Sequence, residues 1–114
     1  MTRAARRPSV AGVDVFIVER YLPGTTASQL RAATSLLSAA ARELAADGTR
    51  ITFLGSTFVD AEEYCFCRFE SDSAANVARA FELAGVSYAR IVGGRHLEPS
   101  APADEPSSRE GIET

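Results

Sequence analysis

Two cysteines and one histidine are the residues of this chain that best suit a transition-metal ion, because Cys65 and Cys67 supply thiolates and His96 supplies an imidazole. The alternation of side chains along a strand puts both cysteines on one face, with their α-carbons about 6.5 to 7 Å apart. A disulfide between them would be strained at that spacing, so we interpret them as reduced core residues. In the strand order derived below, His96 falls beside Asp14, roughly 15 to 20 Å from Cys65. A shared site within one subunit is therefore disfavoured, and all three are weak metal candidates.

Arginine and tyrosine side chains could instead bind a small anion. Strand alternation divides residues 63–70 into a charge-free set and a polar set, and we expect the charge-free set to face the helices. The charge-free set is Cys65, Cys67 and Phe69, and the set expected on the open face is Tyr64, Phe66, Arg68 and Glu70. We expect Arg20 to lie across from Tyr64, and Arg90 to fall near the same row. Two arginines beside a phenol, at one end of an aromatic cleft, suit a carboxylate or a phosphate bound next to a hydrophobic ring.

Two residues at the neighbouring loop complete this candidate ligand site, with Glu19 as a proton acceptor and Tyr21 as a hydrogen-bond partner. The ligand-binding candidates are therefore Glu19, Arg20, Tyr21, Tyr64, Arg68 and Arg90. The alternative is that these arginines are structural, and pair with Glu62, Glu63 and Glu70 or cross a dimer interface. Nothing in the sequence positions a nucleophile for His96 to activate, so the sequence assigns no catalytic residue.

The elements that position these residues follow from the hydrophobic pattern. Residues 13–21 are β-branched and aromatic on both faces in their middle, which is typical of a strand buried on both sides. Thr26 and Gln29 then form a capping box, in which each side chain accepts a backbone N–H of the other residue. Leucine and alanine recur at helical spacing after it and predict a helix over 27–47, which Gly48 stops.

The second half of the chain predicts a hairpin, a helix and a last strand. The ranges are 51–59 and 63–70 for the hairpin strands, 60–62 for their loop, 74 to a stop at Gly85 for the helix, and 89–97 for the last strand. The order β-α-β-β-α-β predicts a ferredoxin-like α+β fold, with a four-stranded antiparallel sheet in the order 4-1-3-2 and both helices on one face.

The face of the sheet opposite the helices needs a cover. We expect it to carry apolar side chains, namely Phe16, Val18, Phe53, Tyr64 and Phe66. A surface of that kind is too apolar to stay bare in water, and packing against a second copy would bury it. We therefore expect a homodimer formed through the open face.

Charge is spread unevenly along the chain, whose net charge is −3 and whose 12 basic residues are all arginines. Residues 1–12 form a basic arm and residues 98–114 an acidic tail rich in proline and serine, and we predict that both are disordered. Residues 13–97 form a single, nearly neutral domain. Without a basic stripe or an apolar run of roughly 18 residues, neither nucleic-acid binding nor a membrane span is indicated. The expected location is the cytoplasm.

Five stretches of the sequence resemble a known family. They are Phe16 to Gly24, Thr26 to Leu30, Asp47-Gly48 before Ile51, Tyr64 to Glu70, and Ala84-Gly85-Val86 before Ile91-Val92. Together they make residues 13–97 look like the small bacterial family catalogued as domain of unknown function 4242. The resemblance implies a ferredoxin-like, dimeric protein, and some relatives are described as nickel-binding. Nickel or another divalent metal is thus the cofactor that the resemblance implies.

The chain departs from the nickel-binding relatives in its histidines. Those relatives are similar in layout but carry one histidine near the end of the first strand and others around the second helix. Here the first strand ends Val18-Glu19-Arg20, and the second helix ends in residues 80–85, neither of which holds a histidine. The metal ligands of the family therefore carry over to no residue of this chain.

Three classes of function follow. The first is a small homodimeric binding protein, not catalytic, for a nickel-type metal ion, as the resemblance implies, or for a small anionic ligand. The alternative is a cofactor-free dimeric α/β-barrel enzyme, similar to a monooxygenase or an isomerase, acting on a small aromatic or lactone acid. An interaction domain that pairs through its edge strands is a third reading of the same pattern.

Overall fold

The computed structural model describes residues 13–99. The elements are β1 (Val13–Tyr21), α1 (Ala27–Ala46), β2 (Ile51–Val59), the short 3₁₀-helix η2 (Asp60–Glu62), β3 (Tyr64–Ser71), α2 (Ala74–Ala84) and β4 (Arg90–His96). The predicted order of strands and helices is confirmed, and η2 forms the loop expected between the hairpin strands. The basic arm of residues 1–12 and residues 100–114 of the acidic tail lie outside the described residues.

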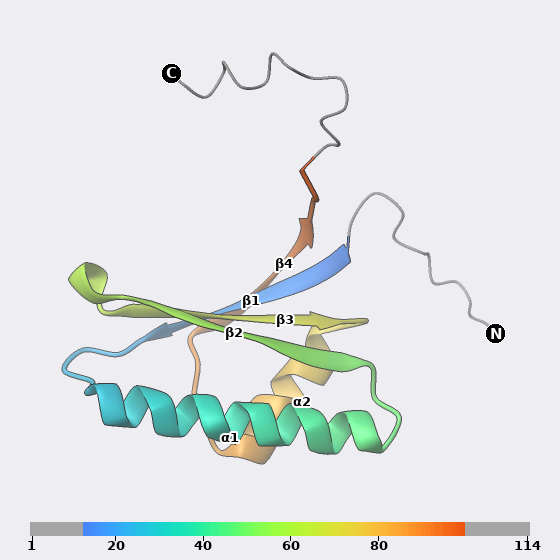
Figure 1. Ribbon diagram of the computed structural model, residues 1–114, viewed down its shortest axis with the longest axis horizontal. Helices are drawn as coiled ribbons and strands as arrows, with labels where there is room; N and C mark the ends of the chain where they lie inside the picture. The colour runs from blue at the N-terminus through green and yellow to red at the C-terminus, as the bar shows by residue number, and fades with distance from the viewer. Residues whose placement is uncertain (1–12, 100–114) are drawn as a thin grey trace, which may run out of the picture.

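The four strands form one antiparallel sheet in the order β2-β3-β1-β4, which is the predicted order. Figure 1 shows both helices on the same side of this sheet, so the ferredoxin-like arrangement is confirmed. Neither helix in the described part of the chain has the length and apolar character needed to cross a membrane. The face of the sheet away from the helices is called the open face below.

Local signals explain where the helices begin and end. At the start of α1, Gln29 N donates to Thr26 Oγ1 at 3.1 Å and Thr26 N donates to Gln29 Oε1 at 2.9 Å, so the predicted capping box is present. At the start of α2, Asn76 N donates to Ser73 Oγ at 3.2 Å. Gly85 then ends α2 with a φ of 72°, a left-handed conformation that glycine adopts without strain.

The core lies between the helices and the inner face of the sheet. Val18, Phe69, Val77 and Ala80 are each 0% exposed. The ring of Phe69 lies at the centre, because its centroid is 4.8 Å from that of Phe53 on β2 and 5.7 Å from that of Phe81 on α2. Burial of this apolar side chain volume is the main favourable contribution to folding.

The composition of the open face differs from the prediction. Phe16 pairs with Phe69 and Val18 pairs with Cys67, so these β1 residues share the inner face with the core. Phe53 also packs against the core rather than on the open face. The expectation that these three residues cover the open face is wrong, because shifting the pairing of two strands by one residue moves every side chain to the other face.

An aromatic row remains on the open face, consisting of Tyr21, Tyr64 and Phe66. The ring centroids of Tyr21 and Tyr64 are 5.5 Å apart, and those of Tyr64 and Phe66 are 5.8 Å apart. Tyr21 is 56% exposed. Two of the five apolar residues predicted for this face therefore lie there, joined by Tyr21.

A β-bulge shifts the pairing register between β2 and β3. Phe53 pairs with Phe69 and Gly55 pairs with Arg68, so Leu54 is an extra residue between them. Gly55 has a φ of 117°, which other L-residues rarely adopt. Beyond the bulge, Ser56 pairs with Cys67, and the bulge therefore determines which β2 side chain lies beside that thiol.

Candidate anion pocket and thiol pair

Arg20 lies on the inner face of the sheet. Its partner in the β1–β3 ladder is Cys65, whereas Tyr64 pairs with Tyr21. The prediction that Arg20 lies across from Tyr64 on the open face is therefore wrong by one residue of register. The consequence is that a guanidinium group lies at the end of the hydrophobic core.

The guanidinium of Arg20 is buried and only partly satisfied. Arg20 is 9% exposed, and its Nε donates to the backbone carbonyl of Ser87 at 2.7 Å. Among residues 13–99, its two Nη groups have no hydrogen-bond acceptor and no carboxylate within ion-pair distance. Ser71, the other buried polar residue, is fully engaged, since its Oγ donates to Arg50 O and accepts from Asn76 Nδ2. A buried cation that lacks a counter-ion is costly, so this arrangement calls for an anion.

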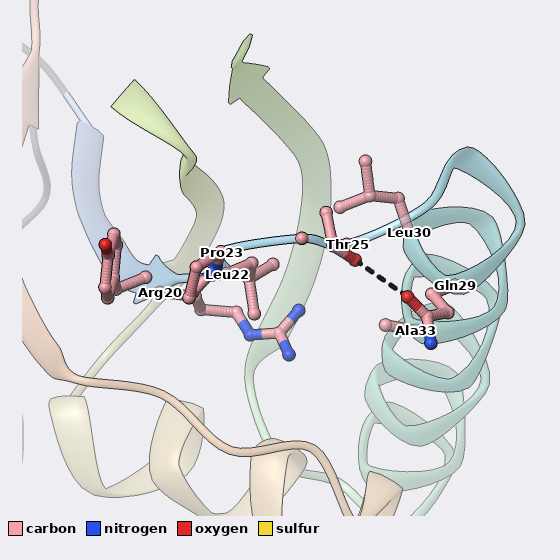
Figure 2. Close-up of a pocket in the computed structure, with 9 residues that line it drawn as sticks. Arg20, Leu22, Pro23, Thr25, Gln29, Leu30 and Ala33 are labelled. Carbon is pink, nitrogen blue, oxygen red and sulfur yellow. Dashed lines mark hydrogen bonds between the residues drawn. The ribbon is translucent and has the colours of Figure 1, made fainter. Parts of the chain in front are cut away.

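A cavity of about 460 Å³ adjoins this guanidinium. Its walls are the 21–25 loop and the first two turns of α1, with Leu22, Leu30 and Ala33 among the apolar lining and Gln29 among the polar lining. Figure 2 shows the guanidinium of Arg20 beneath the loop and directed toward α1. The cavity therefore combines a fixed cation with a lining that is part polar and part apolar.

The loop over this cavity is anchored by Glu63. Leu22 N donates to the backbone carbonyl of Glu63 at 2.8 Å, and Gly24 N donates to Glu63 Oε2 at 3.0 Å. Glu63 itself adopts a left-handed φ of 56° at the end of η2. Both its backbone and its side chain therefore hold the loop, and its carboxylate is engaged there rather than with Arg20.

The other five ligand-binding candidates lie on the open face. Arg90 Nε donates to Glu19 Oε1 at 3.1 Å, and this hydrogen bond raises the pKa of Arg90. Arg68 is exposed and pairs with Ile17 in the ladder, and Tyr21 and Tyr64 belong to the aromatic row. The predicted cluster is thus divided between two faces of the sheet, with Arg20 alone on the inner one. Arg90 forms an ion pair, as the structural alternative predicted for these arginines, but its partner is Glu19 rather than Glu62, Glu63 or Glu70.

Cys65 and Cys67 are both reduced and buried, as predicted. Ser56 Oγ donates to Cys67 Sγ at 3.0 Å, and each of the two thiols affects the pKa of the other. The hydrogen bond from Cys67, with the nearby charge of Arg20 and against the effect of burial, lowers the pKa of Cys65 to about 7. The same hydrogen bond and burial raise the pKa of Cys67.

A second cavity, of about 370 Å³, reaches the thiol pair. It lies between α1 and the hairpin, and Cys65 lines it together with Leu30, Thr34 and Phe58. Cys65 itself is 2% exposed, so it lies at the base of this cavity rather than on the surface. Of the two thiols, Cys65 is therefore the one that a small solute would meet first.

His96 lies far from the thiols. It pairs with Val13 at one end of β1, whereas Cys65 pairs with Arg20 at the other end, roughly 23 Å away at the rise of an extended strand. Its Nε2 lies 3.3 Å from Glu98 Oε2, and half of its side chain is exposed. Within residues 13–99 there is no group of three or more His, Cys, Asp or Glu side chains placed to hold a metal ion.

Three contributors to these sites were not identified from the sequence. Gln29 was assigned only to the capping box, and Ser56 and the carbonyl of Ser87 were assigned no role. The alternation of Phe16, Val18 and Arg20 could have placed the arginine on the inner face. The position of Ser56 could not be inferred, because the bulge before it changes which side chain faces Cys67.

Comparison with known proteins agrees with this fold. Residues 16–93 match the family described as nickel responsive protein SCO4226-like. The crystal structure of SCO4226 from Streptomyces coelicolor A3(2) is similar, with a TM-score of 0.58 and 24% sequence identity, and the match covers 76% of this chain and 98% of that chain. At that identity the structural similarity shows the fold. A comparison with curated proteins gave no match.

Proposed function

Because this chain belongs to the family of nickel-responsive proteins similar to SCO4226, we propose that it is a homodimeric, non-catalytic binding protein, and that its own ligand is a small carboxylate held by Arg20. The family match supports a metal-related role and a binding function. The pocket beside Arg20 is what points to an anion. The resemblance to domain of unknown function 4242 stays a prediction beside this family match.

One observation carries the carboxylate proposal: Arg20 is 9% exposed as a residue, and its guanidinium lacks a counter-ion among the described residues. The bond from Nε to the Ser87 carbonyl fixes the plane of the group and leaves both Nη atoms for a ligand. Two parallel N–H donors match the two oxygens of a carboxylate. A single positive charge also balances a carboxylate better than a doubly charged phosphate.

The rest of the cavity indicates what else the ligand carries. The side chains of Leu22, Leu30 and Ala33 suit a short hydrocarbon segment, and the side-chain amide of Gln29 is one of the polar groups that also line the cavity. The oxygen of that amide is occupied by the N–H of Thr26, so the NH₂ group is the part left to a ligand. A small ligand with one terminal carboxylate and a short apolar segment therefore fits this mixed lining.

We propose binding rather than catalysis because of the pairing register of β1 with β3 and β4. The enzyme alternative needed Arg20, Tyr64 and Arg90 at one end of a single cleft. Arg20 lies on the inner face and the other two residues lie on the open face. Without that grouping, binding is the function that this arrangement supports better.

The test is a calorimetric titration of the full chain with pairs of ligands that differ only in charge. Short aliphatic and aromatic monocarboxylates should bind saturably, with one molecule per chain, and the corresponding primary amides should produce no binding heat. This difference is expected because only the carboxylate offers a negative charge to the two Nη groups. Equal heats for an acid and its amide, or no heat from any acid, would contradict the proposal.

We propose a homodimer because no described element covers the aromatic row of the open face. Phe66→Glu should convert the dimer to a monomer, because it places a charge in the middle of the proposed apolar interface. Ala39→Glu, on the exposed side of α1, is the matched control and should stay dimeric. Light scattering coupled to size-exclusion chromatography measures the mass, and a wild-type monomer would refute the interface.

Nickel binding is the second candidate function, and the family match is the observation that favours it. The described residues of one chain do not fit a nickel site, because they offer no cluster of three ligands. A site completed by the partner subunit is the form left open to them. The same pair of variants tests it: nickel binding at such a site should be lost in Phe66→Glu and retained in Ala39→Glu.

A further inference from the structure

We propose that Cys65 and Cys67 form a binding site for one Cu(I) ion, in which the two sulfur atoms are the ligands and Arg20 balances the charge of the complex. This inference shares Arg20 with the proposed carboxylate site but takes its ligands from other residues, and it assigns to this chain a metal other than the nickel for which its family is named.

The two sulfurs are held side by side by the sheet. Cys65 and Cys67 are alternate residues of β3 on its inner face, so their thiols project from the same side of the strand. Each has a fixed neighbour across the ladder, Arg20 for Cys65 and Ser56 for Cys67. The hydroxyl of Ser56 donates to Cys67 Sγ at 3.0 Å, which orients that sulfur. The pair of ligands is therefore arranged before a metal arrives.

The number and type of ligands select the metal. Thiolates are soft ligands that favour Cu(I) and zinc over hard cations. A structural zinc site takes four protein ligands, and the described residues place no third His, Cys, Asp or Glu side chain with this pair. Cu(I) forms stable complexes with two thiolates alone. Two adjacent sulfurs without further ligands thus fit Cu(I) best.

The charge of a bound copper ion and its two thiolates would be balanced by Arg20. When both thiols bind Cu(I), two S–Cu bonds form and two protons leave, so the copper dithiolate unit carries one negative charge. An anion in the core is strongly disfavoured unless a cation lies beside it. Arg20 is buried on the strand next to Cys65, and its Nη groups have no partner among residues 13–99. A divalent ion on the same two thiolates would be neutral and would leave that cation unbalanced.

The metal has a route to the sulfurs. Cys65 lines the cavity of about 370 Å³ between α1 and the hairpin, whose accessible surface is mostly apolar although the side chains of Arg31, Thr34, Ser35 and Ser56 also line it. A soft, weakly hydrated ion enters such a lining more readily than a hydrated divalent ion. The cavity beside Arg20 is separate from it, apart from the shared wall residue Leu30.

The experiment is an anaerobic competition for Cu(I) between the reduced full chain and the chromophoric chelator bathocuproine disulfonate. The wild type should withdraw one Cu(I) per chain, and native mass spectrometry should show a gain of one copper with the loss of two protons. Cys65→Ser and Cys67→Ser should each weaken binding by a hundredfold or more, roughly the effect of losing one of two metal ligands. Ser56→Ala should weaken binding by about tenfold to a hundredfold, which is less than either cysteine variant, because it removes only a hydrogen bond that orients a ligand.

Three results would overturn the site: a wild type that withdraws no copper, a cysteine variant that binds as tightly as the wild type, or a complex that keeps both thiol protons. Circular dichroism of each variant checks folding, and Cys65→Ala and Cys67→Ala replace any serine variant that unfolds. Arg20→Met should weaken Cu(I) binding by roughly tenfold or more, as expected for removing the counter-charge of a buried anion. Cys67→Ser should still bind carboxylates, so failure of the copper site and failure of the proposed function are separate results.

Discussion

Arg20→Met is expected to weaken carboxylate binding strongly while leaving the free energy of unfolding unchanged or raised. Removing one partner of a buried charge pair costs about 2 to 5 kcal/mol, so affinity should fall by at least about thirtyfold. Calorimetric titration with the best carboxylate measures this loss. Arg42→Met is the matched control, since Arg42 is an exposed residue of α1 and should bind as the wild type does.

The sign of the stability change separates a ligand-binding arginine from a structural one. Without ligand, Arg20 buries a charge that only the Ser87 carbonyl stabilises within the described residues. Methionine loses that hydrogen bond, which contributes about 1.5 to 3 kcal/mol, but it also removes the larger desolvation cost of a buried ion. A marked loss of stability in urea titration, together with unchanged ligand affinity, would show that Arg20 serves the fold instead.

Phe69→Ala is expected to lower the free energy of unfolding by about 3 to 5 kcal/mol, which is the usual cost of emptying a buried aromatic site. Phe69 is 0% exposed and contacts both Phe53 and Phe81, so no neighbour can close the gap without losing its own contacts. A domain of this size has only about 4 to 13 kcal/mol in total. The variant should therefore lose a large part of the stability of the domain, and its urea midpoint should fall accordingly.

Two further variants show that the loss comes from the buried volume. Phe69→Leu keeps most of the side chain and should cost about 1 to 1.5 kcal/mol. Leu83→Ala removes a side chain that is 49% exposed on α2, and it should stay within about 0.5 kcal/mol of the wild type. Urea denaturation followed by circular dichroism measures all three. A Phe69→Ala protein as stable as Leu83→Ala would mean that the core is not centred on this ring.

The elements of the fold were predictable because their signals are local. The capping box of Thr26 and Gln29 and the stop at Gly85 act within a few residues, and the helices begin and end where those signals lie. The strand order followed from the order of elements together with the usual ferredoxin-like arrangement. Both kinds of inference need no knowledge of how distant side chains meet.

The candidate site depended on register, which has no comparable local signal. Shifting β1 by one residue against β3 exchanges Tyr64 for Cys65 as the partner of Arg20. The prediction correctly placed Cys65, Cys67 and Phe69 toward the helices, yet it assigned Arg20 to the other face. Charge favoured that assignment, since arginine is seldom buried. The buried arginine is therefore where the general rule and the structure disagree, and such a disagreement is expected at a functional site.

In the capping box, the oxygen and the nitrogen of the Gln29 side-chain amide have different roles. The oxygen accepts a hydrogen bond from Thr26 N and thereby stabilises the start of α1. That assignment fixes which end of the amide turns outward, so the nitrogen is available for recognition. The start of α1 and the polarity of the adjacent cavity are consequently set by one residue. A glutamine at position 29 therefore preserves both the capping box and a hydrogen-bond donor for a carboxylate. A glutamate at position 29 would preserve the capping box but repel that ligand.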